Sequence, residues 1–214
     1  MKWSKRTTEK QTILEEILNA VSHGLMVPVS IVIFFIFYSK KGVFQFPVFL
    51  LTLTMFMLYL MSCLYHSLSF TKAKRHFQRF DHICIYLLIW GSFLPFLFYS
   101  EEKKLFNLIF CISQSFVILI GILLKIFQFH KDDKIHLILF LLLGWSGIWV
   151  IFDLWSIVNQ NYSILLFLFL GGFFYSIGIL FYNELYKKYY HFIWHLFVIL
   201  ANLCHVYSIF LLIK

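Results

Sequence analysis

Seven long apolar stretches dominate this sequence, and each is long enough to cross a lipid bilayer as a helix. They cover about residues 21–38, 45–66, 82–99, 105–124, 135–153, 163–182 and 190–213. A span needs about 20 mostly apolar residues, because the bilayer core is about 30 Å thick and a helix rises about 1.5 Å per residue. Inside lipid a chain must also satisfy its backbone polar groups internally, as helices do. The sequence therefore predicts an all-α membrane protein built as a seven-helix bundle.

The composition excludes a soluble globular domain. Hydrophobic residues make up 61% of the 214 positions, charged residues make up 13%, and the mean hydropathy is +0.84. Such values are typical of polytopic membrane proteins. Seven spans with short connections use most of the length, so we expect a single transmembrane domain at residues 21–214. The polar residues 1–20 place their apolar side chains at helical spacing, which predicts a cytoplasmic amphipathic segment on the membrane surface.

The distribution of basic residues predicts how the bundle is oriented. The N-terminal segment and the second, fourth and sixth connections carry 13 of the 18 Lys and Arg residues. Because such connections stay in the cytoplasm, we expect a cytoplasmic N-terminus and an external C-terminus. The net charge of +8 is scattered over short loops, so we expect contacts with anionic lipid headgroups and no nucleic-acid binding. No signal-peptide cleavage site follows the first apolar run, which fits a bacterial inner membrane.

A pair of histidines opens the last apolar stretch. His191 and His195 are four residues apart, and residues at this spacing lie on one face of a helix, one turn from each other. Two imidazoles in this arrangement are typical of a metal site, although helical histidine pairs also occur as hydrogen-bonded structural residues. The membrane setting favours a function, because ionisable side chains inside a span are costly.

Three further polar residues are expected at the same depth as this pair. In the predicted topology the second span ends with Ser62 and His66, and the third begins near Asp81. Three neutral imidazoles and one open position are typical of catalytic zinc, which lowers the pKa of bound water to about 7. We therefore predict a Zn²⁺ site formed by His66, His191 and His195. Asp81 would act as a general base or orient a ligand imidazole, and Ser62 would hydrogen-bond the water or a developing oxyanion.

Each of these residues also has a structural interpretation. His66 could place its ring among lipid headgroups, Asp81 could cap the start of the third span, and Ser62 could bond to its own helix backbone. Three imidazoles would also suit copper or nickel. His205 lies about 15 Å along the helix beyond the histidine pair, so we expect it to make a buried hydrogen bond rather than share the metal. For His23, in the first span, both packing and chemistry stay open.

Ordered motifs along the chain resemble a known family. They are Asn19-Ala20-Val21-Ser22-His23-Gly24, Ser62-Cys63-Leu64-Tyr65-His66, Phe80-Asp81-His82, Gly91-Ser92-Phe93-Leu94-Pro95, and His191-x-x-x-His195 followed by His205. Together they resemble the hemolysin III proteins, the bacterial branch of the progestin and adipoQ receptor family, over about residues 16–207. The sequence departs from the family pattern at Leu94 and Phe192, and neither is a proposed ligand.

This resemblance implies a seven-helix bundle with a cytoplasmic N-terminus and with zinc held by His66, His191 and His195. In the receptors, the aspartate that matches Asp81 lies near the zinc-bound water, and the serine that matches Ser62 lies close by. The wider superfamily includes alkaline ceramidases. The resemblance therefore also implies a zinc-dependent hydrolase of lipid amides.

These observations favour a metal-dependent hydrolase of lipid-derived amides or esters, whose substrate enters from the bilayer. Two other functions stay open. The family's name suggests a membrane-disrupting cytolysin, although a secreted pore former needs a soluble state that this apolar chain does not favour. The eukaryotic relatives suggest a lipid-sensing, receptor-like protein with structural zinc. An ion channel or transporter would be expected to carry more charge inside its spans.

Overall fold

The computed structural model describes residues 11–40, 45–99, 104–127, 134–155, 161–183 and 187–213, and the regular secondary structure within them is helical. The helices are α1 (Ile13–Tyr38), α2 (Gln45–Ser67), α3 (Lys74–Leu97), α4 (Lys104–Phe127), α5 (Lys134–Trp145), α6 (Gly147–Asp153), α8 (Tyr162–Asn183) and α9 (Tyr190–Ile213). Seven segments are long and apolar enough to cross a membrane, when α5 and α6 are taken together as one span. The predicted seven-helix membrane bundle is confirmed.

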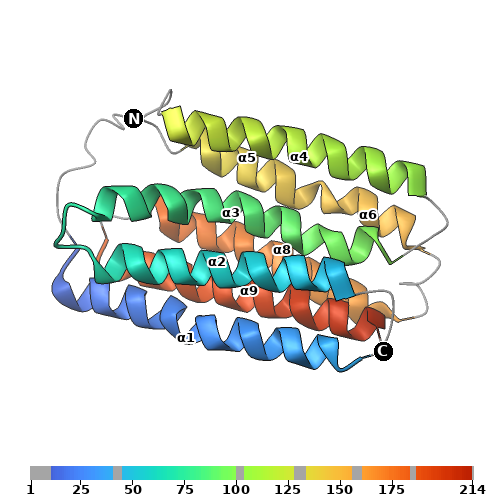
Figure 1. Cartoon of the computed structure of the whole chain (residues 1–214), viewed down its shortest axis with the longest axis horizontal. Helices are drawn as coiled ribbons and strands as arrows, with labels where there is room; N and C mark the ends of the chain where they lie inside the picture. Colours follow the sequence, from blue (N-terminus) through green and yellow to red (C-terminus); the bar gives the residue numbers. More distant parts are fainter. Residues whose placement is uncertain are drawn as a thin grey trace.

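The helices run side by side along the long axis of the molecule (Figure 1). α1 begins at one end of the bundle and α9 ends at the other, as an odd number of crossings requires. In this view α1, α2 and α9 form one side, α4 and α5 form the opposite side, and α3 and α8 lie between them. We call the end at which α1, α3 and α9 begin the entry end; the predicted orientation places it at the cytoplasmic boundary.

Burial identifies α3 as the central helix. In its most apolar stretch 67% of the residues are buried, compared with 22% for α4 and for α8. The outer helices expose many large apolar side chains, such as Phe116 on α4 and Phe169 on α8. Such side chains suit contact with lipid. Because lipid tails are themselves apolar, moving these side chains from lipid into the protein would bring little hydrophobic gain. Polar side chains are therefore expected to gather around α3, away from the lipid.

The first helix starts earlier than the sequence predicted. α1 begins at Ile13 behind a capping box, in which the Thr12 side chain accepts from the Glu15 backbone N–H and the Glu15 side chain accepts from the Thr12 N–H. Residues 13–20 are thus the first turns of the span, continuous with the residues from 21 onwards. The rest of the predicted surface segment, residues 1–10, lies outside the described residues.

The third helix also starts earlier, and this removes one interpretation of Asp81. α3 begins at Lys74 after the N-cap residue Ala73, and not near residue 82. Asp81 therefore lies inside the helix, where the backbone N–H groups already have partners, and the prediction that it caps the helix was wrong. The polar stretch before Asp81 did not predict a helix because its hydropathy is low, but helix formation does not require apolar residues.

The fifth span is broken at Ser146. The Gln114 side-chain amide from α4 donates to the Leu143 carbonyl oxygen at 3.3 Å and to Ser146 Oγ at 2.5 Å. A side chain that bonds to the backbone in this way, close to glycines such as Gly147, is a common cause of a helix break. On the other side, Trp145 Nε1 donates to Ser176 Oγ of α8 at 3.0 Å. The break therefore lies in the middle of the bundle, held from two neighbouring helices.

The orientation can be tested with reporter fusions. Because the basic connections are retained in the cytoplasm, alkaline phosphatase fused after Lys214 is expected to be active and green fluorescent protein at the same point to be dark. The same two reporters fused after residue 187, in the connection before α9, are expected to give the opposite pattern. A fluorescent C-terminal fusion would contradict the predicted orientation.

Candidate metal centre

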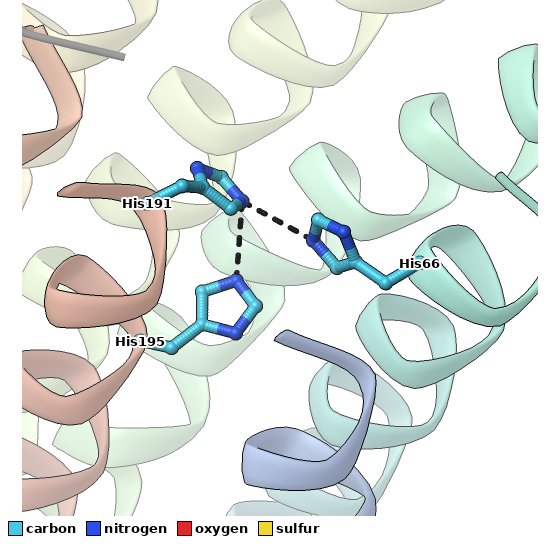
Figure 2. A group of neighbouring side chains, drawn as sticks. All are labelled: His66, His191 and His195. Carbon is cyan, nitrogen blue, oxygen red and sulfur yellow. Dashed lines mark hydrogen bonds between the residues drawn. The ribbon is translucent and has the colours of Figure 1, made fainter. Parts of the chain in front are cut away.

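Three histidine side chains meet at the entry end of the bundle (Figure 2). His66 lies in the last turn of α2, and His191 and His195 lie in the first two turns of α9. Nε2 of His191 is 3.2 Å from Nε2 of His66 and 3.2 Å from Nε2 of His195. Among the residues that the structure describes, these three are the one group of His, Cys, Asp and Glu side chains whose ligand atoms all lie within 4.8 Å.

The spacing of these nitrogens fits a tetrahedral metal ion. Two nitrogens that each lie about 2.05 Å from a tetrahedral zinc ion are about 3.3 Å apart. The observed separations of 3.2 Å agree with that value. His66 and His195 are 1% exposed, so neither ring is available to water from outside the bundle. The donor set consists of neutral nitrogen ligands, which zinc accepts readily.

The hydrogen bonds of the outer ring nitrogens support the same conclusion. Nδ1 of His66 lies 2.7 Å from a carboxylate oxygen of Glu16, which can only accept when ionised. Nδ1 of His195 lies 3.1 Å from Ser22 Oγ, whose own hydrogen is donated to the Asn19 carbonyl oxygen at 2.9 Å. Both Nδ1 atoms therefore carry the proton, and both Nε2 atoms present a lone pair. Nε2 of His191 can donate at most one N–H, which leaves one of these two lone pairs without a partner. A metal cation could bind both lone pairs, so it fits the cluster better than a proton does.

Glu16 is a residue of the candidate site that the sequence did not reveal. Its carboxylate is 4% exposed. One oxygen contacts His66, and the other lies 2.5 Å from Nζ of Lys74 on α3. A carboxylate behind a ligand imidazole fixes the tautomer of the ring and raises its basicity. The signal was present in the spacing, because Glu16, Asn19 and His23 repeat on one face of an otherwise apolar helix. The residue was assigned instead to a surface segment.

α1 contributes a second set of contacts to the cluster. The ring of His23 stacks on the ring of His195, with centroids 3.8 Å apart and planes 7° apart. Both ring nitrogens of His23 lack a hydrogen-bond partner among the described residues. Glu15, next to Glu16, accepts the backbone N–H of Tyr189 at 2.8 Å and so holds the start of α9. The first helix thus positions side chains from both helices that carry the histidines.

Asp81 and Ser62 lie near the three histidines but do not belong to the group whose ligand atoms converge. Both are buried, at 8% and 1% exposure, and the Ser62 hydroxyl lies next to the Asp81 carboxyl group. Ser62 Oγ makes no regular hydrogen bond to a described residue, so the interpretation that it bonds to its own helix was wrong. The Asp81 carboxyl group is the described polar group that it faces. His205, by contrast, bonds to the Leu168 carbonyl, as expected for a residue too distant to share the metal.

A cavity of about 140 Å³ extends from these residues into the bundle. At one water per roughly 10–15 Å³ of such volume, it has room for about ten water molecules or a chain of similar size. Its walls are mostly apolar and include Ile85, Leu88, Phe140, Ile179 and Val198. Trp145 and Phe169 also line it, and they are 45% and 46% exposed on the outer surface of α5 and α8. The cavity therefore reaches the lipid-facing side of the molecule.

Comparison with known proteins identifies related sequences. A family described as "Haemolysin-III related" matches residues 11–206. The protein named "Hemolysin-3" from Bacillus cereus is 36% identical over 203 residues, which cover 91% of this chain and 90% of that protein. The "Hemolysin-3 homolog" from Bacillus subtilis is 36% identical over 198 residues, covering 88% and 89%. These similarities extend over almost the whole length of both relatives.

The role of Glu16 can be tested by replacing its charge while keeping its shape. Glu16→Gln is expected to weaken metal affinity roughly 10- to 100-fold, because the amide cannot hold the His66 tautomer as the carboxylate does. Competition with a chromophoric chelator measures the affinity. Glu15→Gln is the matched control, since its amide oxygen still accepts the Tyr189 N–H. An equal loss of affinity in both variants would show that Glu16 has no specific link to the metal.

Proposed function

Because this chain belongs to the haemolysin-III-related family and is a multi-pass protein of the bacterial cell membrane, we propose that it is a zinc-dependent hydrolase of lipid-derived amides or esters. The observation that carries the proposal is the place of the histidine cluster. Of the three converging imidazoles, those of His191 and His195 line an apolar cavity that also reaches the lipid-facing surface. A lipid could thus enter from the bilayer and present its carbonyl group at the cluster.

Each residue of the site has a definite task in this proposal. His66, His191 and His195 would hold the ion, which would polarise the substrate carbonyl and lower the pKa of a water molecule to about 7. Asp81 takes the proton of the attacking water and returns it to the leaving nitrogen or oxygen. The Ser62 hydroxyl donates a hydrogen bond to the carbonyl oxygen as negative charge develops there. The apolar wall of the cavity holds the chain and excludes bulk water.

Metal content is the first test of this proposal. Purified wild-type protein is expected to contain about one zinc ion per chain by mass spectrometry, and His191→Ala is expected to lose it, because two imidazoles hold zinc poorly. His205→Ala is the matched control, as it removes a histidine from the same helix outside the cluster and keeps the metal. Copper or nickel in the wild type would correct the identity of the metal. Wild-type protein without stoichiometric metal would contradict the site.

Catalysis is tested separately from metal binding. Asp81→Asn is expected to keep its zinc and to lose roughly 10²- to 10⁴-fold in the rate of hydrolysis of a fluorescent long-chain amide, because it lacks the general base. Ser62→Ala is expected to lose activity less, up to about 10³-fold. Full activity in Asp81→Asn would exclude this mechanism. Zinc retained in a wild-type protein that hydrolyses no amide or ester would favour a structural or sensing site.

The names of the two relatives favour membrane lysis as a second candidate function. The two functions differ in what purified protein does to intact vesicles. A cytolysin releases a trapped dye from liposomes without cleaving their lipids, whereas a hydrolase acts on its substrate and leaves the dye inside. Asp81→Asn distinguishes them further, because dye release by a pore does not depend on a general base.

A further inference from the structure

Polar side chains deep in the bundle lie beyond the metal centre and take no part in it. Tyr59 of α2 and Asn202 of α9 are 0% exposed, and Asn202 Nδ2 donates to the Tyr59 hydroxyl at 2.9 Å. Tyr175 of α8 lies within electrostatic reach of Tyr59. Its ring packs against that of His205, with centroids 5.7 Å apart. We call Tyr59, Tyr175, Asn202 and His205 the mid-bundle cluster.

Two atoms of this cluster lack partners. The Tyr175 hydroxyl and Asn202 Oδ1 are buried and make no hydrogen bond to any described residue. Buried polar atoms without a partner are rare in native proteins because their desolvation is not compensated. Here they come from two facing helices in the part of the bundle that should correspond to the bilayer interior. A bound polar group that reached them would supply the missing partners.

Half of the mid-bundle cluster borders the cavity that extends from the candidate metal centre, whereas Tyr59 and Asn202 are not among its lining residues. Tyr175 and His205 line it, and the apolar residues Ile179 and Val198 lie between them and the histidines along α8 and α9. Asn202 and His205 follow His195 by seven and ten residues, which places them about 10 and 15 Å further along the helix. A molecule whose carbonyl group lies at the metal centre would therefore pass the cluster with its chain.

The chemistry of the cluster specifies the group that it would bind. Its members are phenols, an amide and an imidazole that already donates to the Leu168 carbonyl, and no Lys or Arg among the described residues lines the cavity. A carboxylate or phosphate would have no cation to pair with. A hydroxyl group can donate to Asn202 Oδ1 and accept from the Tyr175 hydroxyl. The cluster thus suits an uncharged group that both donates and accepts.

We propose that the mid-bundle cluster binds a hydroxyl group on the acyl chain of the substrate, at a distance from the carbonyl set by the cavity. An extended chain advances about 1.2 Å per bond, so 10–15 Å corresponds to roughly eight to twelve bonds. The preferred substrate class is therefore a long-chain amide or ester hydroxylated near the middle of its chain. This inference rests on the proposed function, because that function places the carbonyl at the histidines.

The test compares the binding of two amides that differ by one hydroxyl. Octadecanamide and 12-hydroxyoctadecanamide displace a fluorescent fatty amide from detergent-purified Asp81→Asn protein, in which turnover is blocked. The two hydrogen bonds of the hydroxyl group, offset in part by its desolvation, predict a roughly five-fold tighter binding of the hydroxylated amide. Adding Tyr175→Phe is expected to abolish the difference. Ser176→Ala is the matched control and is expected to preserve it, because that neighbouring hydroxyl already bonds to Gly172 and Trp145.

The melting temperature distinguishes ligand binding by Tyr175 from a purely structural role of this residue. In lipid-free protein Tyr175→Phe is expected to keep or raise the melting temperature, since it removes a buried hydroxyl that has no partner. A lower melting temperature would mean that the hydroxyl is bonded within the protein, and would overturn the proposal.

The outcomes also separate this inference from the function on which it rests. Equal affinity for the two amides overturns the hydroxyl site and leaves the hydrolase proposal intact. A preference that survives in Tyr175→Phe, or that 2-hydroxyoctadecanamide shows equally, overturns the assignment to the mid-bundle cluster. Failure of both amides to bind contradicts the lipid substrate itself, and with it both proposals.

Discussion

The buried contact between Glu16 and His66 organises the entry end of this bundle. A carboxylate inside a membrane protein needs partners, and Glu16 has two, because His66 and Lys74 occupy its two oxygens. The contact joins α1, α2 and α3, while the neighbouring Glu15 holds the start of α9. It also fixes the protonation of His66, so that the free lone pair of the ring faces the other two histidines. One buried carboxylate and its two partners thus link the packing of these helices to the candidate metal centre.

Much of this arrangement could be predicted from the sequence, and what was missed has a common cause. Hydropathy gave the seven spans, and helical spacing with the order of spans brought His66 to the His191–His195 pair. The local spacing of Glu16, Asn19 and His23 marked a polar face, but the role of Glu16 escaped because its partners, His66 and Lys74, lie in other helices. The early start of α3 escaped because hydropathy measures how apolar a segment is and not whether it is helical. The break at Ser146 depends on Gln114 of α4, which lies 32 residues away in the chain.

The cavity holds both polar and apolar residues, as the proposed hydrolysis of a lipid would require. Along the cavity, Tyr175 and His205 lie beyond the histidines of the entry end, with the apolar Ile179 and Val198 between them. The broken span contributes to this design, because the residues around Ser146 border the cavity and Trp145 reaches both the cavity and the outer surface. A helix interrupted at membrane depth is tolerated where it faces a cavity or other protein groups that bond to its free backbone. Gln114 makes one of those bonds.

The depth of the histidine cluster would allow the proposed reaction with water to take place in such an apolar protein. His66 ends α2 and His191 opens α9, so the cluster lies one or two turns from the end of both helices. In the predicted orientation, water at the membrane boundary is therefore near, while the chain of the proposed lipid substrate would extend in the opposite direction, into the bilayer interior. A site at the centre of the bundle would lack water, and one on its surface would lack the apolar cavity. The ends of α2 and α9 satisfy both needs, and the short distance between them is maintained by the carboxylates of α1.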